Sequence, residues 1–551
     1  MTQGGEAAAA RGRAWLRAAP LPLVLVTAFA LRLAWAWASL DRLVRDATSD
    51  DAYYYFAIAR ELARTGRASF DGETLTNGFH PLWLACVTAV QALGADPERS
   101  VHLALSLSAL FGTATCALVY AILCAVAAPR AAALAAAAAY AVHPYVVVES
   151  VNGLETALSV CALAVVAWTH VRILARDGAP SPRDGMRLGL ALGFAMLART
   201  DSVLVAPPVL LHLAWRGRGA RRWLPPAAAV ALASLLVLPW LAWSWLAVGS
   251  LAQDSARALS DLARSGYLAA HGDALSVRAA RGLELAREAF LVRVPRAYLA
   301  PWRGAELPAL AVAAGLLAAM LALPVSPARE RARRRAALVA APALGIAATL
   351  LDHAALRWWL REWYFAPMGL VCALGLGLAL AWLDEAFAAP AAQPARARAA
   401  LYAGAALLLL AALGPQRARR WVEPSPRRLN QLIAARWLAA HAPPGARVGA
   451  WNAGLLGYFS ERTVVNLDGV VNGDAWRAAR AGRLADYAQE RRLDLVVDWA
   501  GMPQTLCRER PHLECERIAV AGVPLPHPGG SLLHVVRVAP RGPGPPDGVN
   551  P

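Results

Sequence analysis

Long apolar segments separated by short polar ones dominate residues 1–414. A helix rises 1.5 Å per residue, so about 20 apolar residues cross the hydrocarbon core of a membrane. Hydropathy therefore predicts an all-α polytopic membrane bundle of about 11 transmembrane helices. The apolar segments are about 20–40, 79–95, 101–127, 131–149, 154–175, 186–215, 223–248, 306–324, 337–352, 364–383 and 400–414.

Arginines gather in the short segments between the apolar ones, as is typical of cytoplasmic loops. The most basic of these segments is ARERARRR at 328–335, and three further arginines precede the first apolar segment. We therefore expect a cytoplasmic N-terminus, retained as an anchor, and an extracytoplasmic first loop at 41–80. This assignment requires that either 79–95 or 131–149 fails to cross the membrane, and the sequence leaves open which. The other segments expected outside are 149–155, 199–201, 249–305, which should form amphipathic helices, and 353–364.

Composition supports a membrane protein and argues against a nucleic-acid partner. Hydrophobic residues make up 58% of the chain and charged residues only 17%, against about a quarter charged in soluble domains. The net charge of +17 comes from arginines in loops, which the positive-inside rule explains better than a phosphate-binding face does. Membrane lipids are therefore the expected surroundings. No Walker loop, HExxH or CxxC motif appears in the sequence.

The composition of the chain becomes that of a soluble domain after residue 414. Helices at 429–441 and 484–491 alternate with strands at 447–451, 463–468 and 493–498, which predicts a small α/β domain over 415–540 on the outer side. The tail at 541–551 is rich in Pro and Gly and is expected to be disordered. Three polar residues follow predicted strands and either bind an acceptor or cap turns: Asn452, Asp468 and Asn472.

Cysteine spacing predicts one disulfide. Cys507 and Cys515 lie in CRERPHLEC, in the predicted extracytoplasmic domain, where the surroundings are oxidising. The other five cysteines lie in apolar segments and are interpreted as packing residues.

Two adjacent carboxylates stand out in the first outer loop. The pattern from 51 to 64 is that of an amphipathic helix with Tyr54 on its apolar stripe. Asp50 and Asp51 would lie at the N-terminus of this helix, where the helix dipole keeps a carboxylate ionised for use as a general base or cation ligand. The alternative is a plain N-cap beside an aromatic belt at the membrane surface.

Charged residues near apolar segments give the next candidates, because such positions are costly. Arg199 and Asp201 lie at a break in the apolar hairpin 186–215 and form either a structural ion pair or part of a phosphate-binding cavity. Arg357 and Arg361 are spaced one helical turn apart in ALRWWLREWYFAP. They are either snorkelling arginines in an aromatic belt or ligands of a lipid phosphate.

The first outer loop resembles that of the bacterial GT-C glycosyltransferases, membrane enzymes that take sugars from polyprenyl-phosphate donors. The residues that carry the resemblance are SDDAYYYFAIAR at 49–60, SFDG at 69–72, TNGFHPLW at 76–83, NGLETAL at 152–158, ARTDS at 198–202, REWYFAP at 361–367 and NAGLLGYFSERTVVNLDGVVN at 452–472. The subfamily includes mannosyl- and arabinofuranosyl-type transferases, and the motifs do not specify the sugar.

The resemblance implies an inverting transfer from a polyprenyl-phosphate sugar to a glycan, lipid or protein acceptor of the cell envelope, on the outer face of a bacterial inner membrane. It implies that Asp50 is the base, that Asp51 orients the acceptor or binds a cation, and that arginines hold the phosphate. The remaining cavity residues that it implies are Tyr54, His80, Glu155, Asp201 and Tyr364. No cofactor is certain, and a divalent cation near the two aspartates is left open.

Two functions from other classes share the hydropathy. A transporter or flippase of lipid-linked sugars would show internal repeats and broken helices at the midplane, and no repeat is evident in the sequence. A non-catalytic scaffold for envelope assembly would have the same topology as the enzyme. Mutation of Asp50 distinguishes this scaffold from an enzyme.

Overall fold

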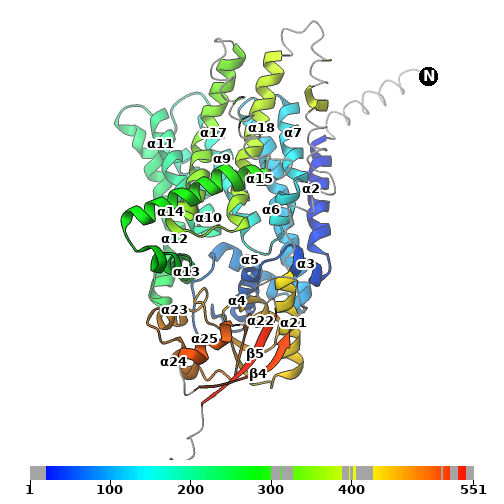
Figure 1. The fold of residues 1–551 in the computed structure, drawn as a ribbon. Helices are drawn as coiled ribbons and strands as arrows, with labels where there is room; N and C mark the ends of the chain where they lie inside the picture. The colour runs from blue at the N-terminus through cyan, green and yellow to red at the C-terminus, as the bar shows by residue number, and fades with distance from the viewer. Residues whose placement is uncertain are drawn as a thin grey trace, which may run out of the picture.

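The computed structural model consists of a bundle of helices with a smaller domain at one end (Figure 1). It describes residues 20–298, 311, 315, 327–387, 396, 401–404, 426–499, 501–509, 513–521 and 532–540. The boundary at 414, the tail at 541–551 and almost all of the apolar segments 306–324 and 400–414 therefore lie outside the described residues. An all-α membrane bundle with a small α/β domain is confirmed as the fold class.

Five helical segments are long and apolar enough to cross a membrane, within the residues that the structure describes. A sixth forms if α2 and α3, which meet at an angle of 105°, count as one broken span. The predicted count of about 11 therefore stays a prediction. The helices of the bundle are α2 (Pro20–Ala36), α6 (Pro97–Ala125), α7 (Arg130–Val142), α8 (Pro144–Glu149), α9 (Thr156–Leu174), α10 (Pro182–Ala198), η1 (Thr200–Val205), α11 (Ala206–Arg216), η2 (Ala220–Trp223), α12 (Leu224–Val248), α17 (Pro327–Leu351) and α18 (Ala366–Phe387).

The most basic loop segment and the C-terminal domain lie at opposite ends of the bundle, as the loop charges predict. Figure 1 places the start of α17, which carries the basic segment 328–335, at the end of the bundle opposite to the C-terminal domain. The predicted break in the apolar hairpin 186–215 is also present, because α10 ends at Ala198 and a 3₁₀ helix precedes α11.

The helix α5 (Pro81–Gln91) lies in one of the two apolar segments that are candidates for not crossing the membrane. Its 11 residues span about 16 Å at 1.5 Å per residue, roughly half of a hydrocarbon core. Figure 1 places α5 beside α4, at the end of the bundle that carries the C-terminal domain. The helix α7, with 13 residues, is also shorter than a membrane-spanning helix, so the choice between 79–95 and 131–149 as the segment that does not cross is left open.

Helix α4 (Asp50–Thr65) lies between the bundle and the C-terminal domain (Figure 1). Every residue from Ala52 to Ala59 is buried, so the predicted amphipathic pattern is wrong for the first half of the helix. The reason is that α5 covers one side of α4 and α22 covers another. The remaining elements at this end of the bundle are α3 (Leu40–Asp46), α13 (Asp254–His271), α14 (Leu275–Glu288), the π-helix η3 (Ala289–Arg293), α15 (Val294–Tyr298), the π-helix η4 (Asp352–Arg357) and the 3₁₀ helix η5 (Glu362–Phe365).

The C-terminal domain is built on a mixed five-stranded sheet of order β2-β1-β3-β5-β4. Strand β1 pairs in parallel with β2 and β3, whereas β5 is antiparallel to β3 and β4. The strands predicted at 447–451, 463–468 and 493–498 are confirmed to within two residues. The elements of the domain are α21 (Pro426–His441), β1 (Arg447–Ala450), α22 (Gly454–Phe459), β2 (Thr463–Asn466), α23 (Gly473–Arg480), α24 (Leu484–Glu490), β3 (Leu495–Trp499), α25 (Met502–Glu509), β4 (Leu513–Ala521) and β5 (Leu533–Pro540).

Candidate active site

The carboxylate of Asp50 is held by the C-terminal domain. Its two oxygens accept hydrogen bonds from the backbone N–H groups of Leu455 at 2.8 Å and Gly454 at 3.1 Å. Burial raises the pKa of Asp50 to about 7, although the two N–H bonds oppose this shift. Burial thus opposes the effect expected of the helix N-terminus, which favours the ionised form of Asp50.

Asp51 differs from its neighbour, because within the described residues its carboxylate has no hydrogen bond and no ion pair. Burial is the largest cause of the raised pKa of Asp51. The guanidinium of Arg361 opposes this rise, as does that of Arg428 from α21, whereas the charge of Glu155 adds to it. A carboxyl group with a raised pKa and no partner is suited to accept a proton near neutral pH.

Arg361, whose charge acts on Asp51, also lacks an ion-pair partner among the described residues. Its guanidinium lies 4.4 Å from the ring centroid of Trp359. Arg357, in contrast, is paired with Asp352 at 2.5 Å. The two arginines do not share a helical face as expected, because Trp358 adopts the left-handed conformation (φ 60°) and ends the helical turn between them.

Arg199 lies in a buried network of charges. It donates to Glu155 at 2.7 Å and to Asp201 at 2.9 Å, and His353 contacts Asp201 at 2.7 Å. The ring of Tyr364 stacks on His353 with centroids 3.9 Å apart and lies beneath the guanidinium of Arg199. The network joins the predicted outer segments 149–155, 199–201 and 353–364, but it leaves Arg199 with two carboxylates rather than free for a phosphate.

Glu155 connects this network to the first outer loop. It accepts a hydrogen bond from the hydroxyl of Tyr55 at 2.9 Å, and His80 lies 3.6 Å from its other oxygen. The backbone N–H of Thr200 donates to the ring of His80 at 3.3 Å. Residues far apart in the sequence thus meet at the end of the bundle that adjoins α4.

Tyr54 is held by the C-terminal domain. Its hydroxyl donates to the carbonyl oxygen of Trp451 at 3.2 Å and accepts from the backbone N–H of Ala453 at 3.1 Å. The side chain of Asn466 also donates to it at 3.2 Å. Asn466 was missed in the sequence, where only its position at the end of a strand could have drawn attention to it.

Of the three polar residues predicted to bind an acceptor, two have structural partners. The side chain of Asn452 donates to Asp498 at 2.9 Å, and Asn472 caps α23 by accepting from Ala475. Asp468 accepts one backbone hydrogen bond, from Val470 at 2.9 Å. Its pKa is raised to about 7, first by burial and further by the charges of Asp51 and Asp50, so three carboxyl groups from two domains influence one another here.

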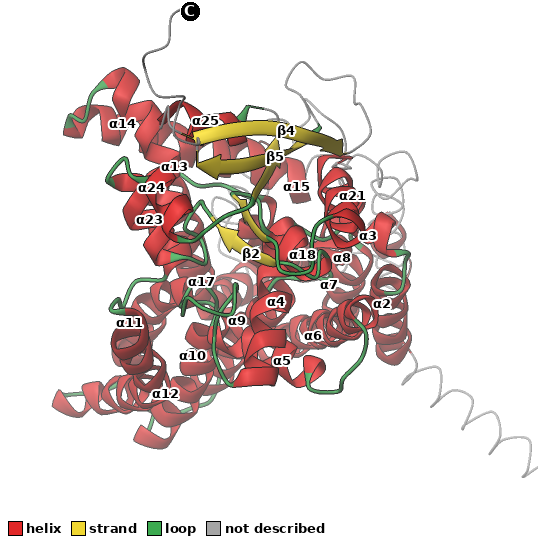
Figure 2. Ribbon diagram, turned by 90° about the horizontal axis from the view of Figure 1, so that it is seen from below, coloured by secondary structure: helices red, strands yellow, loops and turns green. Residues whose placement is uncertain are grey.

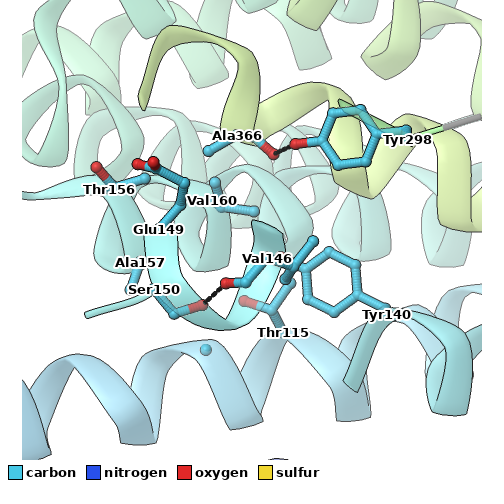
Figure 3. Close-up of a pocket in the computed structure, with 11 residues that line it drawn as sticks. Thr115, Tyr140, Val146, Glu149, Ser150, Thr156, Ala157, Val160, Tyr298 and Ala366 are labelled. Atoms are coloured by element: carbon cyan, nitrogen blue, oxygen red, sulfur yellow. Dashed lines mark hydrogen bonds between the residues drawn. The ribbon is translucent and has the colours of Figure 1, made fainter. Parts of the chain in front are cut away.

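Two hollows lie in the bundle near this network. One is lined by Arg199, Asp201 and His353, with Tyr364 beside them. Figure 3 shows the other, which is lined by Glu149, Thr156 and Tyr298 among apolar side chains. Glu149 accepts a hydrogen bond from the side chain of Asn152 at 2.9 Å, which links a lining residue of this hollow to the segment 152–158.

Cys515 takes part in a disulfide, as predicted, and the other five cysteines whose side chains are described are free. The side chain of Cys507 lies outside the described residues, so its role as the partner stays a prediction. Among the described residues, no group of three or more His, Cys, Asp or Glu side chains is arranged to hold a metal ion. The divalent cation near Asp50 and Asp51 also stays a prediction.

Comparisons with known proteins address the fold. Residues 80–243 match the family model of dolichyl-phosphate-mannose-protein mannosyltransferases, and residues 424–525 match a domain of unknown function, DUF8728. The crystal structure of ArnT from Cupriavidus metallidurans bound to undecaprenyl phosphate aligns with a TM-score of 0.55 at 15% identity, covering 94% of this chain and 97% of that one. The chain has the GT-C fold.

A second GT-C structure leads to the same conclusion. The Archaeoglobus fulgidus oligosaccharyltransferase, in complex with zinc and sulfate, aligns with a TM-score of 0.54 at 15% identity and covers 87% of this chain and 68% of that one. No curated protein matches the sequence. The resemblance to GT-C glycosyltransferases seen in the motifs is thereby confirmed, and at this level of identity the structural likeness concerns the fold.

Proposed function

We propose that this GT-C protein is a glycosyltransferase that moves a sugar from a polyprenyl-phosphate donor to an acceptor hydroxyl on the outer face of the membrane. The family model matched by residues 80–243 supports a lipid-linked mannosyl-type donor class. ArnT bound to undecaprenyl phosphate supports a polyprenyl carrier. The arginine-rich start of α17, at the end of the bundle away from the C-terminal domain (Figure 1), supports an extracytoplasmic site.

The observation that carries the proposal is the contrast between Asp51 and Asp50. Asp50 uses both of its oxygens to hold the C-terminal domain, whereas Asp51 has no such partner among the described residues. We therefore assign the role of general base to Asp51 and a positioning role to Asp50. This reverses the roles that the family resemblance implies.

In the proposed reaction Asp51 takes the proton of the acceptor hydroxyl as the oxygen of that hydroxyl attacks the anomeric carbon of the donor sugar. The bond between the anomeric carbon and the phosphate oxygen breaks on the opposite face, so the configuration inverts. Polyprenyl phosphate leaves with both bonding electrons. Arg361, which has no ion-pair partner among the described residues, stabilises the charge that grows on this phosphate in the transition state.

Asp468 belongs to the acceptor side of the proposed site. It comes from the C-terminal domain, and its carboxyl group is close enough to Asp51 and Asp50 for their charges to raise its pKa. We assign to it a hydrogen bond to a second hydroxyl of a polyhydroxylated acceptor.

The test is transfer activity in proteoliposomes supplied with radiolabelled polyprenyl-phosphate mannose, arabinofuranose or glucose and membrane extract as acceptor. Asp51→Asn should lower turnover by about 10²–10⁴-fold, the usual contribution of a general base. Asp46→Asn is the matched control, because Asp46 lies in the same predicted outer loop and, among the described residues, its ion pair is with the exposed Arg45. If wild-type protein releases labelled product and Asp51→Asn does so equally well, the assignment fails.

A further inference from the structure

Helices α13 and α14 form a helical hairpin at the periphery of the molecule. Figure 1 shows α14 running crosswise to the upright helices α17 and α18, and Figure 2 places it at the outer edge in the view from the C-terminal domain. If α17 and α18 cross a membrane, a helix crosswise to them lies along the membrane plane. The hairpin follows α12 after a short loop, at the end of the bundle where the C-terminal domain is attached.

Large apolar side chains on this hairpin are exposed. Leu262 of α13 is 59% exposed, and Leu275 and Leu283 of α14 are 83% and 72% exposed. At the end of α12, the helix that precedes the hairpin in the chain, Leu246 is also 83% exposed. A surface of this kind on a soluble domain would be unusual, but next to a membrane-spanning helix it has a natural partner in lipid.

The charges of the hairpin are largely neutralised within it. Arg278 pairs with Asp273, and Arg281 pairs with Glu284 at 2.8 Å. Little positive charge is therefore left to attract anionic lipid headgroups. Any affinity of this surface for a membrane should come from the leucines.

Side-chain contacts also fix the hairpin to the rest of the protein. Its position relative to the helices of the bundle is therefore defined. The indole N–H of Trp476, from α23, donates to Asp261 at 2.8 Å. On the other side Tyr267 meets Trp358 edge to face with centroids 5.6 Å apart, and Gly282 lies against the carbonyl oxygen of Ala355. These contacts tie the hairpin to both the C-terminal domain and the turn that precedes Arg361.

We propose that the α13–α14 hairpin inserts Leu262, Leu275 and Leu283 into the outer leaflet of the membrane, at the boundary between headgroups and acyl chains. Amphipathic helices that lie in this plane bury their apolar face by several ångströms. The insertion is apolar and does not need anionic lipid. The inference is independent of the proposed transfer reaction and holds equally for a chain that moves no sugar.

The experiment places an environment-sensitive fluorophore (NBD) on Leu275→Cys and, separately, on Leu283→Cys in full-length protein reconstituted into phosphatidylcholine vesicles. Ala481→Cys, at an exposed position of the C-terminal domain, is the control for an aqueous site. The parent chain, whose five described free cysteines lie in the bundle, gives the background labelling. The expected result is a blue-shifted emission at 275 and 283 that doxyl-labelled lipids quench at least about twofold more than at 481.

Three outcomes would overturn the proposal. Emission at 275 and 283 equal to that at 481 would place the hairpin in water. A blue shift without quenching by doxyl lipids would indicate contact with protein, such as a second copy of the chain. Quenching that appears only when phosphatidylglycerol is added, and disappears in high salt, would replace apolar insertion by electrostatic attachment.

Discussion

Asp50 and Leu455 are 405 residues apart in the sequence and are joined by a 2.8 Å hydrogen bond from the Leu455 backbone N–H to the Asp50 carboxylate. The Gly454 N–H donates to the second oxygen of the same carboxylate. The first turn of α4 is therefore coupled to the C-terminal domain through a residue adjacent to the proposed base. Any change that loosens this contact also moves Asp51.

Asp50→Asn should loosen the contact. An amide oxygen can accept one of the two N–H groups, but its NH₂ group faces the other and leaves that donor unsatisfied, at a cost of about 1–3 kcal/mol. We expect faster hydrogen–deuterium exchange in peptides covering residues 453–456 at pH 8, where Asp50 is ionised because its pKa is about 7. Asp51→Asn is the control and should leave the exchange unchanged. Equal exchange in wild type and Asp50→Asn would mean that the hydrogen bonds to Asp50 do not stabilise residues 453–456.

Gly454→Ala tests the same interface by sterics. A Cβ at this position would overlap the backbone carbonyl oxygen of Asp50, so α22 would have to move away from α4. Overpacking of this kind costs about 1–3 kcal/mol. We expect a lower melting temperature of the detergent-solubilised protein. Gly445→Ala is the matched control, because a Cβ there meets no atom within 4 Å, and a similar loss in both variants would contradict the interface.

Asp71 and Glu73, in the loop between α4 and α5, should contribute differently to the free energy of unfolding. The side chain of Asp71 is only 3% exposed and accepts hydrogen bonds from the N–H groups of Glu73 and Thr74 and from Arg491. Glu73 is half-exposed and forms a two-bond ion pair with Arg447. In chemical unfolding at pH 7, Asp71→Asn should therefore cost about 1–3 kcal/mol and Glu73→Gln less than about 1 kcal/mol.

The ion pair of Glu73 also has a pH signature. The hydrogen bonds from Arg447 lower the pKa of Glu73 in the folded protein. Its contribution to stability is therefore present above the ordinary pKa of a glutamate and is lost as the pH falls through the lowered value. The difference between Glu73→Gln and wild type should accordingly disappear in acid. A difference that persists there would show that the side chain acts through packing instead.

Several features of the site could be predicted from the sequence because they follow from composition and period. Loop charges predicted that 149–155, 199–201 and 353–364 share one side of the membrane, and the network of Glu155, Arg199 and His353 joins these segments. The strands of the C-terminal domain were visible as short apolar runs. Loop charge and short apolar runs can be read from the sequence without knowing how the helices and strands pack.

Other features could not be predicted, because they depend on groups that the sequence does not distinguish. The donors to Asp50 are backbone N–H groups, which every residue except proline carries. The separation of Arg357 from Arg361 arises from the positive φ of Trp358, an unusual conformation for a bulky residue. The complete burial of the first half of α4 requires a second domain to pack on it, so the helical period of α4 alone was misleading.

Arg199 and Arg361 should respond differently to removal of their charge. Arg199→Met leaves the buried carboxylates of Glu155 and Asp201 without their cation, which costs about 3–5 kcal/mol for a buried pair. Arg361→Met removes an exposed cation and should change stability by less than about 0.5 kcal/mol. Thermal unfolding in detergent, followed by binding of undecaprenyl phosphate to the folded variants, separates the two roles. A stable Arg199→Met that fails to bind the lipid would restore Arg199 as a phosphate ligand.

The pH dependence of transfer gives the most specific test of the proposed base. Asp51 acts when ionised, so its pKa sets the acid limb of the kcat/KM profile. Burial raises this pKa and the charge of Arg361 lowers it, so Arg361→Gln should move the acid limb to higher pH and lose more activity at low pH than at high pH. Arg357→Gln should leave the limb in place, because the charge of Arg357 is already neutralised by Asp352. A loss in Arg361→Gln that is uniform across pH would mean that Arg361 binds the phosphate without acting on Asp51.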